Sequence, residues 1–129
     1  MCIRDRIECI RFDGGRFDIL NGFDEMLLCG MAVGARGGVG STYNYSLRTY
    51  QNIYDAFMAG DLEQARAAQQ ESVDIVHVII NHGGGIRGGK AIMKLVGIDC
   101  GDCRLPLAPY TEAEIARLDE ELRAIGFKK

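Results

Sequence analysis

The chain has 129 residues, of which 47% are hydrophobic and 26% are charged, a composition that allows one modest core and fits neither a disordered nor a membrane-spanning protein. A net charge of -3 and a pI of 5.3 provide no basic face for phosphates, so no nucleic acid partner is expected. The longest apolar runs are too short to predict a membrane segment. The start lacks the apolar core of a signal peptide, so a cytoplasmic protein is expected. Its five cysteines are therefore expected to be reduced thiols.

The first elements in chain order predict a strand-helix unit. Residues 7–11 resemble the last turn of a helix, which ends at the glycines after Asp13. The alternation in Arg16–Leu20 predicts a buried strand, and a helix is expected over Met26–Ala35.

A second unit follows directly. Gly37–Gly40 is expected to be a short, glycine-rich strand in front of a long helix over residues 44–59, whose aromatic and apolar residues recur at the spacing of one helix face. Because parallel strands bring their carboxyl ends to one rim, the two units predict an α/β fold that binds ligands there.

The rest of the chain predicts a helical tail. We expect helices over residues 61–81, capped by Asp61 with Gln64 as its partner, over 90–96, and from Thr111 to Gly126 with a capping box to Glu114. Two strands cannot form a covered parallel sheet, and a closed eight-stranded barrel takes about 250 residues, so the chain is expected to be the last part of a larger domain.

Adjacent carboxylates at Asp24 and Glu25 are the first candidate site. Neighbouring residues at a helix start point in different directions, which favours gripping two hydroxyls of a polyol over sharing one proton. The alternative is that both carboxylates complement the helix dipole.

Glycine-rich segments give two further candidates. Gly34, Gly37, Gly38 and Gly40 before Ser41-Thr42 are consistent with a phosphate cradle or with close backbone approach. Residues 84–91 match a phosphate-binding loop except that Ala91 replaces the hydroxyl residue that would ligate magnesium, so a nucleotide-binding module is retained only as an alternative.

Cys100 and Cys103, with His77 and His82 upstream, provide a weak zinc pattern, because the histidines are five residues apart and no second cysteine pair exists. A loop with reduced thiols is the favoured interpretation. Tyrosines in the long helix are expected to form core and subunit packing with their hydroxyls on polar partners, namely Tyr43, Tyr45, Tyr50 and Tyr54.

Three segments together resemble the C-terminal part of the N-acetylneuraminate lyases, relatives of the dihydrodipicolinate synthases: residues 21–25, 37–44 and 99–106. The resemblance implies a partial (β/α)8 TIM barrel, with its last two strand-helix units in residues 7–59 and a C-terminal helical extension of the same domain in residues 60–129. Residues 1–6 do not continue the resemblance and are expected to be a non-native start.

The resemblance also implies an activity for the complete protein. That activity is class I aldolase cleavage of N-acetylneuraminate into pyruvate and N-acetylmannosamine through a lysine Schiff base, without metal or other cofactor, in a homotetramer. A related pyruvate-dependent sugar-acid aldolase is the alternative within the family.

No catalytic residue is expected in this chain, because the Schiff-base lysine and its tyrosine would lie upstream. The lysines that the chain does carry are not at strand ends, so the chain alone is expected to be inactive: Lys90, Lys94, Lys128 and Lys129. By motif match, the expected contribution is substrate binding through Gly22, Asp24, Glu25, Gly40 and Ser41.

Overall fold

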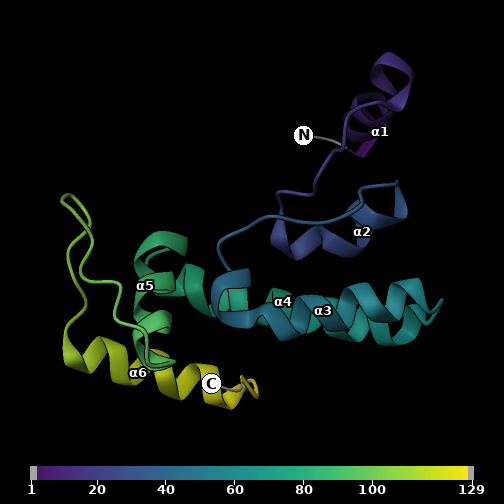
Figure 1. The fold of residues 1–129 in the computed structure, drawn as a ribbon. Helices are drawn as coiled ribbons and strands as arrows, with labels where there is room; N and C mark the ends of the chain where they lie inside the picture. The colour runs from purple at the N-terminus through teal and green to yellow at the C-terminus, as the bar shows by residue number, and fades with distance from the viewer. Residues whose placement is uncertain (1–2, 128–129) are drawn as a thin grey trace.

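The computed structural model describes residues 3–127, which form α-helices joined by turns and one long loop (Figure 1). None of the helices in this range is long and apolar enough to cross a membrane. In chain order the helices are α1 (Ile3–Arg11), α2 (Leu27–Ala32), α3 (Tyr43–Met58), α4 (Leu62–Asn81), α5 (Gly85–Leu95) and α6 (Glu112–Ala124), with short 3₁₀ turns at Phe12–Gly15 and Asp24–Met26.

Helices α3 and α4 form an antiparallel hairpin that lies at the centre of the fold (Figure 1). A short turn at Gly60 joins them, and Asp61 caps α4 by accepting the backbone N–H of Gln64 at 2.9 Å, as its sequence predicts. The first hydrophobic cluster lies where α2 packs on this hairpin, and its buried members are Leu27, Met31, Tyr50, Ile53 and Ala68.

The second hydrophobic cluster lies at the far end of α4, where α5 and α6 pack against it (Figure 1). Its buried members are Ile75, Val78, Ile79, Ala91, Ile92, Leu118, Leu122 and Phe127. The predicted capping box of α6 is confirmed, because the Thr111 N–H donates to Glu114 Oε2 and the Glu114 N–H donates to Thr111 Oγ1. Since α4 contributes to both clusters, it connects the N-terminal and C-terminal halves.

The predicted strands are not formed in residues 3–127. Where they were expected, one parallel bridge joins Asn21 to Gly38, through N–H···O bonds of 2.8 Å from Asn21 to Gly37 and from Val39 to Asn21. The prediction of a buried strand over Arg16–Leu20 was wrong, since a strand needs a ladder of such bonds and a covered face.

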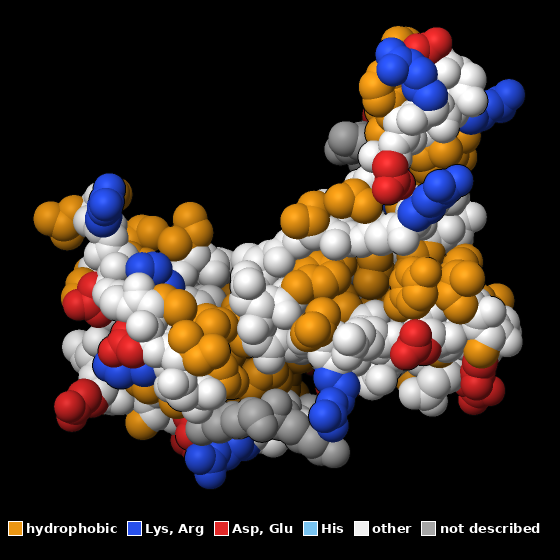
Figure 2. All heavy atoms as spheres, in the orientation of Figure 1, with side chains coloured by type: hydrophobic (Ala, Val, Ile, Leu, Met, Phe, Trp, Pro, Cys, Tyr) orange, Lys and Arg blue, Asp and Glu red, His pale blue; other side chains and the backbone are white. Residues whose placement is uncertain are grey.

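The apolar side chains of this region are exposed instead, including Phe17 (42%) and Leu20 (48%). Figure 2 shows hydrophobic side chains gathered over α1 and α2 on the same face.

Two helix boundaries also differ from the prediction. The helix expected over Met26–Ala35 is shorter, because the chain turns at Gly34 with a φ of 105°. The helix expected over residues 90–96 begins earlier, at Gly85, and the expected glycine-rich break after α4 is confined to residues 82–84.

Packing explains the glycines of α5. A Cβ on Gly88 would lie 3.0 Å from Ile79 Cγ2 of α4, and a Cβ on Gly89 would lie 3.4 Å from Tyr45 Cε1 of α3. These glycines therefore let α5 approach both helices of the hairpin.

The expected division of the chain stays a prediction. Of the expected non-native start, residues 1–2 lie outside the described residues, and residues 3–6 are part of α1.

Candidate functional site

A hollow of about 300 Å³ lies between residues 22–25, which we call the first rim loop, residues 40–42, which we call the second rim loop, and the C-terminal end of α4. We call it the rim pocket. All five predicted substrate-binding residues line it, although they come from segments that are separated in the sequence. Its lining residues are Gly22, Phe23, Asp24, Glu25, Gly40, Ser41, Thr42, Val76, Ile79, Ile80 and Gly85.

The two carboxylates of the first rim loop have different surroundings. Asp24 is buried, and its Oδ2 accepts the backbone N–H of Thr42 at 3.1 Å and the Thr42 hydroxyl at 2.5 Å. Glu25 is half-buried, and no hydrogen-bond partner is found for its side chain among the described residues. The two carboxylates, both expected to bind a ligand, therefore differ in what they contact. Asp24 joins one rim loop to the other, whereas the oxygens of Glu25 remain available for a ligand.

The glycine of the second rim loop explains how Asp24 fits. A Cβ on Gly40 would lie 1.7 Å from Asp24 Oδ1, far inside van der Waals contact. Of the two interpretations of the glycine-rich segment, this favours close approach over a phosphate cradle at that position. The same holds for Gly38, where a Cβ would lie 2.9 Å from Leu27 Cδ1.

A chain of hydrogen bonds continues beneath the pocket. The Thr42 hydroxyl lies 2.6 Å from the hydroxyl of Tyr50, which is buried in the hairpin. Burial raises the pKa of Tyr50 to about 12, the bond to Thr42 opposes that rise, and the charge of Asp24 adds to it. Burial and the same charge also raise the pKa of Tyr43. Both phenols therefore stay neutral at physiological pH, and Tyr50 supports Asp24 through the Thr42 hydroxyl.

A second support for Asp24, which was not predicted from the sequence, comes from α4. Gln69 Nε2 donates to the backbone oxygen of Asp24 at 3.3 Å, and the backbone N–H of Leu28 donates to Gln69 Oε1 at 2.9 Å. One local feature of the sequence is consistent with this role of Gln69. It lies near the small, buried residues Ala68 and Ser72, which indicate that another segment approaches α4 closely there.

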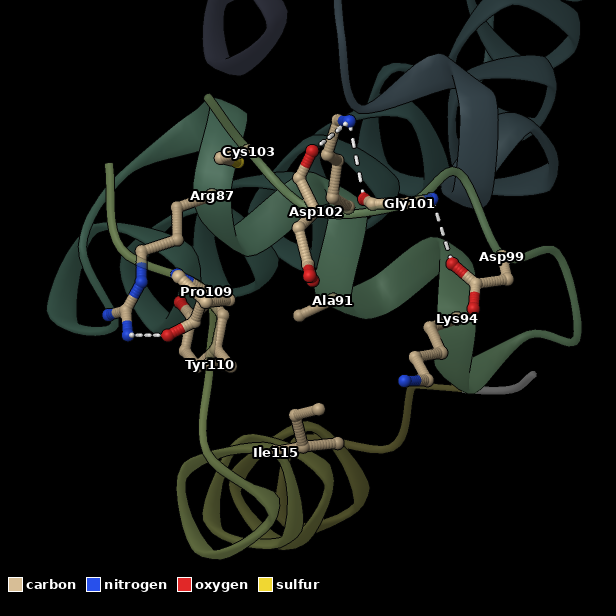
Figure 3. Close-up of a pocket in the computed structure, with 11 residues that line it drawn as sticks. Arg87, Ala91, Lys94, Asp99, Gly101, Asp102, Cys103, Pro109, Tyr110 and Ile115 are labelled. Carbon is tan, nitrogen blue, oxygen red and sulfur yellow. Dashed lines mark hydrogen bonds between the residues drawn. The ribbon is translucent and has the colours of Figure 1, made fainter. Parts of the chain in front are cut away.

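The residues of the phosphate-loop motif are engaged within the protein. Lys90 Nζ donates to the backbone oxygens of Cys100, Gly101 and Asp102 at 3.0 to 3.2 Å. Figure 3 shows Asp99, Gly101 and Asp102 of this loop beside α5. Arg87 donates to the backbone oxygens of residues 108 and 109 and to the Glu114 carboxylate. Because a lysine has three donors, Lys90 has none left for a phosphate in this arrangement.

The zinc pattern is not assembled among residues 3–127, where no group of three His, Cys, Asp or Glu side chains is placed to hold a metal. His82 instead lies 3.0 Å from Glu121 of α6, and His77 is exposed. Cys100 and Cys103 are free cysteines, as the favoured interpretation predicts.

Comparison with known proteins assigns the family. The model of the dihydrodipicolinate synthetase family matches residues 3–125. The chain is 35% identical over 107 residues to the N-acetylneuraminate lyase of Rhizobium meliloti, covering 83% of this chain and 36% of the relative. It is 38% identical over 123 residues to that of Gallus gallus, covering 94% and 40%.

Solved structures agree with the sequence comparison. The N-acetylneuraminate lyase of Proteus mirabilis superposes with a TM-score of 0.91 at 35% identity, covering 98% of this chain and 42% of that one. The lyase of Aliivibrio salmonicida gives 0.90 at 35% identity with the same coverage. The chain spans less than half the length of these relatives, and it belongs to the dihydrodipicolinate synthetase family.

Proposed function

We propose that this chain is the sugar-binding part of a Schiff-base aldolase that cleaves N-acetylneuraminate into pyruvate and N-acetylmannosamine. The observation that carries the proposal is that Gly22, Asp24, Glu25, Gly40 and Ser41 line one hollow of about 300 Å³. That volume is at the lower end of small-molecule sites, which suits one arm of a sugar acid.

The chemistry of the rim pocket supports a polyhydroxylated ligand. Glu25 offers carboxylate oxygens for which no partner is found within residues 3–127, and Ser41 offers an exposed hydroxyl on the opposite loop. Hydrogen bonds to charged acceptors are worth about 1.5–3 kcal/mol each, so a ligand without the matching hydroxyls is penalised. The role of these residues is therefore specificity.

We further propose that, in the complete protein, the segments before the two rim loops are the last two strands of a (β/α)8 barrel, although this chain alone forms a single bridge there. The parallel bridge between Asn21 and Gly38 supports this, since it aligns the two segments in the direction that a barrel requires. The exposed apolar side chains before the first rim loop also support it, because such a surface is typical of one that other elements cover: Phe12 (65%), Phe17 (42%) and Leu20 (48%).

The covalent step belongs to a lysine outside this segment. Lys90 is bound to backbone oxygens, Lys94 is exposed on α5, and neither lines the rim pocket. Lys128 and Lys129 lie outside the described residues. A Schiff base needs an amine that reaches the keto carbon, so the chain alone is expected to release no pyruvate from N-acetylneuraminate.

Two measurements test the proposal. N-acetylneuraminate titrated into the chain and followed by nuclear magnetic resonance is expected to shift the backbone amides of Gly22 and Ser41. Glu25→Gln is expected to weaken that binding about tenfold. The control, Glu63→Gln, changes an exposed carboxylate in the first turn of α4 and is expected to leave the affinity unchanged.

The second measurement concerns turnover. A hybrid that joins this chain to the preceding part of the Proteus mirabilis lyase is expected to release pyruvate, and Glu25→Gln in the hybrid is expected to lower the activity. If N-acetylneuraminate does not bind to the chain, or if Glu25→Gln and Glu63→Gln lower the affinity equally, the proposed role is contradicted. Preference of the hybrid for another sugar acid would assign the related aldolase activity instead.

A further inference from the structure

We propose that Gln69 and Thr42 are positioning residues that set the specificity of the rim pocket by holding the loop that carries Glu25. The inference rests on the proposed function, because it concerns how the same pocket distinguishes between sugar acids. It adds two residues that did not enter the assignment of the ligand contacts.

Gln69 fixes the backbone on both sides of Glu25. Its side-chain amide donates to the backbone oxygen of Asp24, and its side-chain oxygen accepts the N–H of Leu28, at 3.3 and 2.9 Å. Glu25 thus lies between two anchored points only a few residues apart. The anchor is separated from Asp24 by 45 positions in the sequence, so it also couples the rim loop to the hairpin.

Gln69 is itself held in place. Its Nε2 lies 2.6 Å from Ser72 Oγ, which is fully buried and donates to the backbone oxygen of Gln69 at 2.9 Å. A side chain fixed in this way loses little conformational freedom when the loop docks on it. Gln69 therefore provides a rigid reference for the direction of the Glu25 carboxylate.

Thr42 fixes the side chain of Asp24, which directly precedes Glu25. Its N–H and hydroxyl both contact Asp24 Oδ2, and its hydroxyl also lies 2.6 Å from the Tyr50 hydroxyl. Ser41 directly precedes Thr42 and lines the pocket. Together, Thr42 and Gln69 therefore fix the two rim loops relative to each other. Thr42 joins the second rim loop to the first, and Gln69 joins the first rim loop to α4.

The test compares the affinity of the chain for N-acetylneuraminate with its affinity for the analogue that lacks the two terminal hydroxyl-bearing carbons. Gln69→Ala is expected to lower the ratio of the two affinities about tenfold, a change of about 1.4 kcal/mol. Gln70→Ala removes a neighbouring amide that donates to Asp74 on the exposed face, and it is expected to keep the ratio.

Thr42 is tested by a matched pair of variants. Thr42→Val removes the hydroxyl at constant shape and is expected to lower the ratio, whereas Thr42→Ser keeps the hydroxyl and is expected to restore most of it. If Thr42 had a purely structural role, Thr42→Val would lower the affinity for both ligands equally, and the ratio of the two affinities would stay unchanged. Circular dichroism of each variant confirms the helical content before the affinities are compared.

The outcomes separate the two proposals. If the unmodified chain binds neither sugar acid, the proposed function fails, and the positioning inference fails with it. If the unmodified chain prefers N-acetylneuraminate to the shortened analogue, and both Gln69→Ala and Thr42→Val keep the same ratio of affinities, only the positioning inference is overturned.

Discussion

The Asp24 carboxylate occupies the space that a side chain at Gly40 would need. The Cβ position of Gly40 lies 1.7 Å from Asp24 Oδ1, and the other carboxylate oxygen accepts two hydrogen bonds from Thr42. The glycine and the carboxylate, which are on different loops, therefore form one contact that sets the width of the rim pocket. A change at either residue is expected to move both loops.

Gly40→Ala tests this contact. The added methyl group has no room unless Asp24 moves, so the free energy of unfolding is expected to fall by about 1–3 kcal/mol, as for other overpacked sites. Gly22→Ala is the control, because a Cβ at Gly22 meets no heavy atom within 4 Å. Urea denaturation followed by circular dichroism measures both. Equal stability of the two variants would contradict the close contact.

Asp24 and Glu25 are expected to separate stability from binding. Asp24→Ala leaves the Thr42 N–H without its buried acceptor, which costs about 1–3 kcal/mol. Glu25→Ala removes no hydrogen bond found in the described part of the chain, so it is expected to change stability by less than about 0.5 kcal/mol. Urea midpoints measure the first effect, and the affinity for N-acetylneuraminate measures the second. A large loss of stability in Glu25→Ala would show that this carboxylate has an internal role.

The helices were predictable where the signal is local. The hairpin and α6 follow from apolar periodicity and from caps that span three residues, such as Asp61 to Gln64 and Thr111 to Glu114. The strands were not predictable as such, because their hydrogen bonds and their burial depend on segments far away in the sequence. The start of α5 was missed because Gly88 and Gly89 usually mark a break, and here they serve packing.

The same contrast holds for the site. Resemblance to known sequences pointed to five residues that the structure places around one pocket, namely Gly22, Asp24, Glu25, Gly40 and Ser41. It did not identify Thr42 or Gln69, since their bonds to Asp24 cross 18 and 45 positions and leave no periodic trace in the sequence. Side chains that support a site from beneath are chosen by the local packing, which only the folded chain reveals.

Lys90 is expected to hold the long loop between α5 and α6. Lys90→Met removes three bonds to backbone oxygens, so the loop opens more often and tryptic cleavage after the exposed Arg104 is expected to accelerate several-fold. Lys94→Met removes one tryptic site as well but none of these bonds, and it serves as the control. Protection of the unmodified chain by ATP with magnesium would favour the nucleotide-binding alternative.

Glu114 is expected to make the stability of the chain depend on acid pH. The backbone N–H of Thr111, followed by Arg87 and the Thr111 hydroxyl, lowers the pKa of Glu114 from 4.5 to about 2. Because the folded pKa lies below the unfolded one, the ionised group stabilises the fold above about pH 4.5. This contribution is lost as the pH falls through about 2.

The measurement is the urea midpoint between pH 5 and pH 2, compared between the unmodified chain and Glu114→Gln. The midpoint of the unmodified chain is expected to fall more steeply, because the neutral variant has no charge to lose. The bond from His82 also lowers the pKa of Glu121, but this effect is the same in both proteins, so their difference isolates Glu114. Glu112→Gln, in the same first turn of α6, is expected to follow the unmodified chain, and parallel curves for all three proteins would contradict a stabilising charge at Glu114.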